Sequence, residues 1–167
     1  MSRPVALVTG GGRGIGAAIS DRLAADGYDV LLTYNRSSKP AEMIVDEIRE
    51  RGDDALAVKV DCSDRGEVGL LGTHPWMARG IDVLVLNHGI YNRIAGDKMT
   101  LKDLETTMAT NFEGAVSVCS YHHASPGPFH EPGMCPSSAS LERRRDCIFN
   151  HAPQYHVFLA PLWRSPL

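Results

Sequence analysis

Thr9-Gly-Gly-Gly-Arg-Gly-Ile-Gly16 is the stretch that decides how this chain of 167 residues folds. It follows an apolar, β-branched run at residues 5–9 and precedes a helical pattern of apolar residues that ends at Gly27. Glycines at such a junction allow a tight turn, close helix packing and the approach of a phosphate to the backbone N–H groups of the helix. The stretch therefore predicts a nucleotide-binding turn; a glycine-rich turn without a ligand is the alternative.

Short apolar runs alternate with helical patterns from residue 4 to about residue 120. After the first strand, further buried strands are predicted at residues 29–33, 55–60 and 81–86. Crossovers between parallel strands are right-handed and place helices on both faces of the sheet. The prediction is a Rossmann-like α/β fold, a truncated doubly wound parallel sheet of about four strands in the order 3-2-1-4.

Three further helices are expected between and after these strands. One begins near Pro40 and stops at Gly52, and one covers residues 65–79 but is weakened by three glycines and a proline. The last covers residues 101–119, where Thr100 is the expected N-cap and Asp103 occupies the N3 position of a capping box.

The pattern fails after residue 120. Residues 121–167 contain seven of the ten prolines, five of the seven histidines and no lysine. Within them, residues 143–149 and 157–160 are the two places where a short strand or turn is expected. We predict two regions: a dinucleotide-binding Rossmann half at residues 1–120, and an irregular, poorly ordered tail at residues 121–167.

The composition narrows the class of protein. The net charge of -3 gives no reason to expect nucleic acid or an anionic membrane as a partner, and no apolar run approaches the roughly 18 residues of a membrane helix. Without a signal-like N-terminus, a cytoplasmic location is expected, where the four cysteines would be free thiols. No metal site is predicted, because the formal zinc spacing of His151 and His156 lacks a cysteine pair.

The glycine stretch resembles the fingerprint T-G-x-x-x-G-x-G of the short-chain dehydrogenase/reductase family, with Gly10, Gly14 and Gly16 as its three glycines. Asp61 ends the third strand, where the family places an aspartate against the adenine ring. The resemblance covers residues 4–120. Within the family, the glycine stretch and residues 34–36 look most like the 3-oxoacyl-thioester reductases.

Two more motifs follow in the family's order. Leu86-Asn-His-Gly89 stands where the family usually has N-N-A-G, so Asn87 and Gly89 match the motif, while Leu86 and His88 depart from it. Asn111 lies in a segment similar to the one that carries the family's catalytic asparagine. The resemblance implies that Asn111 supports a helix bend and a water relay.

The expected cofactor is NADP rather than NAD. An NAD site usually has an acid about 20 residues after the glycine loop, and no carboxylate occurs between Asp29 and Glu42. Arg13 and Arg36 could instead flank a 2′-phosphate, although a solvated loop cation is the alternative for Arg36. The expected cofactor-binding residues are Gly10, Arg13, Gly14, Ile15, Gly16, Arg36, Asp61, Asn87 and Gly89.

The rest of the family's catalytic set is missing. The resemblance implies a serine and a Y-x-x-x-K pair, but the last lysine is Lys102, and the later tyrosines Tyr121 and Tyr155 are followed four residues on by serine and leucine. Of that set only Asn111 is matched. The abrupt onset of the tail suggests a truncated or frame-shifted product, or a splice or gene-model variant.

Three functions remain open at this stage. The chain is an NADP-dependent oxidoreductase by family, acting on a small carbonyl or hydroxyl substrate and impaired or inactive as it stands. Alternatively it is a non-catalytic module that binds a nucleotide or a full-length homologue, or a non-functional fragment whose fourth strand lies exposed at a sheet edge. Homo-oligomers, common in the family, are expected to be weakened.

Overall fold

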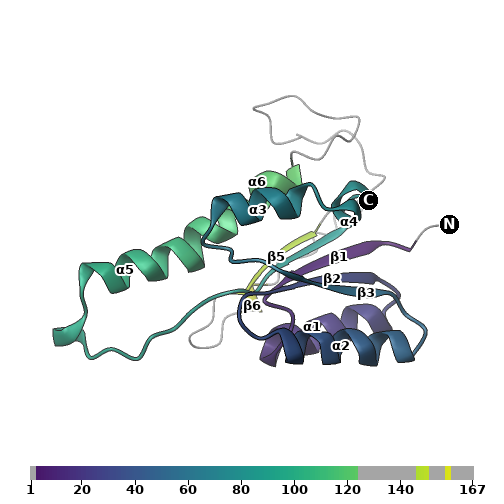
Figure 1. Cartoon of the computed structure of the whole chain (residues 1–167), viewed down its shortest axis with the longest axis horizontal. Coiled ribbons are helices and arrows are strands. Elements are labelled where there is room, and N and C mark those ends of the chain that lie inside the picture. Colours follow the sequence, from purple (N-terminus) through teal and green to yellow (C-terminus); the bar gives the residue numbers. More distant parts are fainter. Residues whose placement is uncertain (1–2, 124–145, 151–156, 159–167) are drawn as a thin grey trace, which may run out of the picture.

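The computed structural model describes residues 3–123, 146–150 and 157–158. One sheet organises the fold, with strands in the order β3-β2-β1-β4-β5-β6 (Figure 1). The first five run parallel, and β6 is antiparallel to β5. The strands are β1 Val5–Thr9, β2 Asp29–Tyr34, β3 Ala55–Lys59, β4 Val83–Leu86, β5 Asp146–Asn150 and β6 Val157–Phe158. The predicted parallel order 3-2-1-4 is confirmed.

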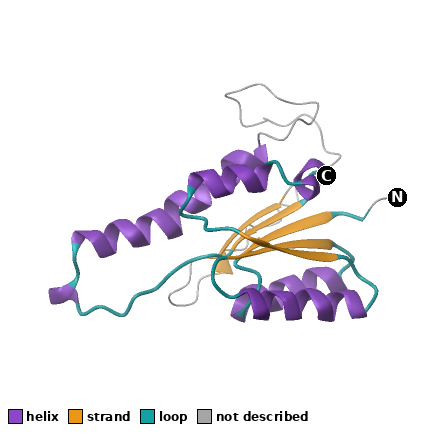
Figure 2. Ribbon diagram, viewed as in Figure 1, coloured by secondary structure: helices purple, strands orange, loops and turns teal. Residues whose placement is uncertain are grey.

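Helices cover both faces of the sheet (Figure 2). On one face lie α1 Gly14–Ala25 and α2 Ser38–Glu50, and on the other lie α3 Arg65–Gly72, α4 Pro75–Ala78 and α6 Gly114–His123. Between β4 and α6 come a 3₁₀ turn at Gly96–Lys98, helix α5 Leu101–Met108 and a π-helical segment Ala109–Glu113. Helix α5 extends away from the sheet and has no buried residue.

Strand β1 lies between two hydrophobic cores, one on each face of the sheet under its layer of helices. All five residues of β1 are buried, as in a parallel strand covered on both sides. Ala6 and Val8 join the core that includes Val45 and Ile48 of α2. Val5 and Leu7 of the same strand join the other core, which is shared with α3, α4 and α6. This alternation holds the carboxyl end of β1, and therefore the glycine stretch, between the two layers.

The predicted helix over residues 65–79 is in fact two helices. Helix α3 ends at Gly72, and α4 starts anew with Pro75 in its first turn and with His74 as N-cap, whose Nδ1 accepts the Trp76 N–H at 3.2 Å. Proline has no N–H to donate within a continuing helix, so the helix breaks just before Pro75. The predicted capping box of Thr100 and Asp103 is present.

The expectation that β4 lies at an exposed sheet edge is wrong. Strand β5 pairs with β4 in parallel, with Val83 opposite Asp146, and β6 follows it. Both additional strands overlap the two places, residues 143–149 and 157–160, where the sequence predicted a short strand or turn. Residues 121–123 of the predicted irregular tail form the end of helix α6. The tail residues outside this helix and the two strands, including Cys135, His151 and Tyr155, lie outside the described residues.

Within the described ranges, no helix is both long and apolar enough to cross a lipid bilayer.

Candidate functional site

The predicted site residues gather at one edge of the sheet. Residues 10–16 follow β1, Arg36 follows β2, Asp61 follows β3, and Asn87 follows β4. Parallel strands carry their carboxyl ends at the same edge, so four separate segments of the sequence meet there.

The glycine stretch is anchored to β2 at its start. The Gly10 N–H donates to Thr33 Oγ1 at 3.2 Å, and the Gly11 N–H donates to the Thr33 carbonyl at 3.0 Å. Gly16 brings α1 against the same turn, since a Cβ there would lie 2.2 Å from the Gly10 carbonyl oxygen. No side chain fits at that position.

The start of α1 is open and, like the start of α2, has no side-chain cap. Gly14 has φ +55°, and an added Cβ would meet nothing within 4 Å. Arg13 is the N-cap residue and makes no side-chain capping hydrogen bond, and Ile15 beside it is 56% exposed. Side chains do cap the starts of α3, α4 and α5, through Asp64, His74 and Thr100. The first-turn N–H groups of α1 thus lack a side-chain cap and suit an anion.

Asn87 ties the end of β4 to the glycine stretch. Its Nδ2 donates to the carbonyl oxygens of Thr9 at 3.2 Å and Gly10 at 3.0 Å. Its own N–H donates to Thr9 Oγ1 at 3.1 Å. The exposed Gly89 lies close to Asn111, because an added Cβ would be 3.3 Å from Asn111 Oδ1.

Asn111 is held by the loop that follows β4. Its Oδ1 accepts the Ile90 N–H at 2.8 Å, and its Nδ2 donates to the Ile90 carbonyl at 2.9 Å. The residue lies in the π-helical segment, where a helix widens locally and turns its side chains. Both functions of the amide are engaged with one backbone residue, which fixes the orientation of the side chain.

Asp61 forms the part of the site after β3. Its Oδ1 accepts from Ser63 Oγ at 2.6 Å and from the Ser63 N–H at 2.9 Å. The Ser63 hydroxyl is the main cause that lowers the pKa of Asp61, with smaller contributions from an Asn35 hydrogen bond and the Arg36 charge. The Asp61 carboxylate, just after β3, thus lies near Asn35 and Arg36, which follow β2.

Sequence reasoning missed three contributors to this edge. Thr33 binds the glycine stretch, Ser63 binds Asp61, and Asn35 helps to lower the pKa of Asp61. Short polar residues just beyond strand ends are the signal that could have found them.

Cys62, next to Asp61, is buried, which raises the pKa of its thiol to about 12. No group of three or more metal-ligating side chains occurs in residues 3–123 and the two tail strands.

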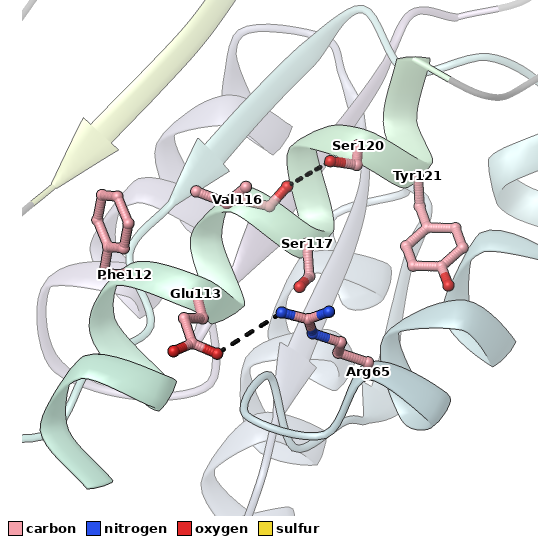
Figure 3. Close-up of a pocket in the computed structure, with 7 residues that line it drawn as sticks. All are labelled: Arg65, Phe112, Glu113, Val116, Ser117, Ser120 and Tyr121. Atoms are coloured by element: carbon pink, nitrogen blue, oxygen red, sulfur yellow. Dashed lines mark hydrogen bonds and ion pairs between the residues drawn. The ribbon is translucent and has the colours of Figure 1, made fainter. Parts of the chain in front are cut away.

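A groove elsewhere on the molecule contains none of the predicted site residues. It has a volume of about 450 Å³ and lies along α6, where Arg65 of α3 reaches Glu113 at 3.7 Å (Figure 3). Tyr121 packs on α3 beside it, since a Cβ on Gly69 would lie 3.2 Å from the Tyr121 hydroxyl. The glycines that weaken α3 thus make room for this ring. The lining residues are Arg65, Phe112, Glu113, Val116, Ser117, Ser120 and Tyr121.

A comparison with protein families gives one decisive match. The sequence profile described as short chain dehydrogenase matches residues 4–124. The chain belongs to the short-chain dehydrogenase family. The family segment contains all of the predicted site residues and agrees with the resemblance expected over residues 4–120.

Curated short-chain dehydrogenase relatives match the same part of the chain. A hydroxynaphthalene reductase-like protein Arp2 of Metarhizium guizhouense is 39% identical over 108 residues, which are 64% of this chain and 40% of the relative. The 3-oxoacyl-[acyl-carrier-protein] reductase FabG of Staphylococcus aureus is 36% identical over 110 residues, 65% of this chain and 45% of that protein. The chain thus spans less than half the length of these two relatives.

Solved short-chain dehydrogenase structures share the fold. A short chain dehydrogenase from Burkholderia cenocepacia, solved in complex with NADP, has a TM-score of 0.70 and 38% identity, covering 74% of this chain and 51% of its own. A blue fluorescent protein from a metagenomic library, in complex with NADPH, has a TM-score of 0.68 and 37% identity, covering 73% and 51%.

Proposed function

We propose that this chain binds NADP at the carboxyl edge of β1 to β4. The observation that carries the proposal is the open start of α1, where Gly14 leaves space and no side chain caps the N–H groups. A pyrophosphate would accept hydrogen bonds from those N–H groups and face the positive end of the helix dipole. Asn87 and Thr33 hold the turn in that shape.

The preference for NADP rests on charge at the end of β2. Arg36 and Arg13 are both exposed, and no carboxylate follows β2 before Glu42. Guanidinium groups bind a 2′-phosphate through paired N–H donors, whereas an acid at this place would bind the 2′-hydroxyl of NAD. Relatives solved with NADP and NADPH support the same choice.

The proposed chemistry by family is hydride transfer between NADP and a carbonyl or hydroxyl carbon. The nicotinamide ring would supply or accept the hydride, while Asn111 would hold its place beside Ile90. Reductase names among the relatives favour a carbonyl substrate. The 167 residues contain no tyrosine with a lysine four positions later, so we propose that this polypeptide by itself transfers hydride poorly or not at all.

A non-catalytic nucleotide-binding module is the second candidate. The missing Y-x-x-x-K pair favours it, because the proposed nucleotide contacts need neither residue. An assay of NADPH oxidation by the purified chain with a carbonyl substrate separates the two candidates. Turnover above the background rate supports the oxidoreductase, and its absence supports the module. We also propose residues 1–120 as the dinucleotide-binding unit, to whose sheet the tail adds β5 and β6.

Thermal unfolding with added nucleotide tests the binding proposal. A ligand at about 100 times its Kd adds about 2.7 kcal/mol of stability, which a melting curve resolves easily. We expect a larger shift with NADP than with NAD, and Arg36→Met to weaken NADP binding by roughly 10- to 100-fold, the value of a charge-assisted contact. Arg49→Met, at an exposed position near the end of α2, is the matched control. A larger shift with NAD would disprove the preference.

A further inference from the structure

His88 lies at the junction of three elements of the site. Its Nδ1 is 2.7 Å from Thr9 Oγ1 at the end of β1, and its Nε2 is 3.1 Å from the Thr110 carbonyl oxygen in the π-helical segment. Gly114 leaves the ring its space, because a Cβ there would lie 3.0 Å from Nε2. One imidazole thus bridges two segments that are 79 and 22 residues from it in sequence.

The contact with Thr110 supplies a hydrogen-bond donor to a carbonyl group that loses its usual backbone donor in the π-helical segment. In an α-helix the Gly114 N–H would donate to Thr110, four residues earlier. Here it donates to the carbonyl of Ala109 instead. Since a carbonyl oxygen only accepts hydrogen bonds, Nε2 of His88 must carry the proton of this contact.

The contact with Thr9 holds the other ring nitrogen. Thr9 Oγ1 receives the N–H groups of Asn87 at 3.1 Å and His88 at 3.3 Å, which occupy its two lone pairs. The Thr9 hydroxyl donates to the Val85 carbonyl oxygen at 3.2 Å, and its oxygen lies 2.7 Å from Nδ1 of His88. Both ring nitrogens are thus held, and the Thr110 contact requires a proton on Nε2.

We propose that His88 is a positioning residue that sets Asn111 for the function of this site. The His88 ring binds Thr110, and the Asn111 amide binds back to Ile90, so two reciprocal ties join residues 88–90 to residues 110–111. The second tie requires the π-helical segment to stay at a fixed distance from the loop, which the first tie provides. The role of Asn111 in hydride transfer rests on the proposed function, whereas the tie itself does not.

Three substitutions at His88 test the tie. Glutamine can place an amide N–H near the Nε2 position, asparagine reaches only the Nδ1 position, and alanine reaches neither. The readout is amide hydrogen exchange at the Ile90 N–H, which the Asn111 side chain protects. We expect exchange roughly tenfold faster in His88→Ala and His88→Asn, or about 1.4 kcal/mol in local opening, and near-parent exchange in His88→Gln.

A spectroscopic signature in the unmodified chain makes the test independent of how well the variants fold. Nitrogen-15 resonances of the His88 ring should show a protonated Nε2. An unprotonated Nε2, unchanged Ile90 exchange in His88→Ala, or equal acceleration at the buried Leu31 of β2 would each overturn the proposal. An NADP titration is read separately: its failure would reject the nucleotide proposal and leave the Ile90 result standing.

Discussion

Replacing Gly16 by alanine is the sharpest test of how the glycine stretch is built. The added Cβ would lie 2.2 Å from the Gly10 carbonyl oxygen and 2.4 Å from Asn87 Nδ2. Ordinary van der Waals contact begins at 3.4 Å, so the first distance is 1.2 Å too short. The helix α1 must therefore strain against the turn, and Asn87 must give up its hydrogen bonds to Thr9 and Gly10.

The expected cost follows from these contacts. Overpacking a close-packed position costs about 2 kcal/mol, and the two Asn87 hydrogen bonds contribute about 1 kcal/mol each. Alanine recovers about 1 kcal/mol through its better helix propensity. The variant should therefore lose about 3 kcal/mol of unfolding free energy, which lowers the melting temperature by roughly 10 °C for a domain of this size.

Gly66→Ala is the matched control, because Gly66 also lies in the first turn of a helix. Its added Cβ would meet only the flexible Asp64 carboxylate, at 3.1 Å. We expect no loss, or a gain of up to about 1 kcal/mol from propensity. Circular dichroism melting without nucleotide measures both variants. A Gly16→Ala chain that melts with the parent, or a Gly66→Ala chain that falls equally far, would refute the packing argument.

Three further predictions concern single side chains. Cys62, whose pKa is raised to about 12 by burial, should stay unmodified by a thiol reagent at neutral pH in the folded chain and react once denaturant unfolds it, as peptide mass mapping would show. Ser63→Ala should raise the pKa of Asp61, which a carbon-13 titration of the carboxyl group would measure. Because the pKa of Asp61 is lower in the folded than in the unfolded chain, its contribution to stability is present at neutral pH and is lost as the pH falls through the folded pKa. The variant should lose part of this contribution. Thr100→Ala should speed amide exchange in α5 by removing a cap worth about 1 kcal/mol, while the melting temperature stays constant because α5 buries no residue; a lower melting temperature would contradict this.

Local patterns in the sequence were sufficient for the main architecture. Buried parallel strands are short apolar runs, and amphipathic helices repeat every three or four residues, so both are visible without tertiary contacts. The glycine stretch, the capping box at Thr100 and the break in propensity before Pro75 are local in the same sense. The split of the predicted helix at residues 65–79 shows the limit, since propensity indicated weakness but not where the helix would end.

What the sequence by itself determined is therefore the family, the parallel order of the first four strands and the edge of the sheet at which the site forms. Only the tertiary structure decided which groups meet there. Asn87 and Thr9 are 78 residues apart, and Asn111 and Ile90 are 21 apart, so no pattern within one helix or strand reports their contacts. His88, in sequence only a mismatch to a motif, gains its role because folding brings the ends of β1 and β4 beside a widened helical turn. The pairing of β5 with β4 is likewise a long-range backbone contact that local propensity cannot specify.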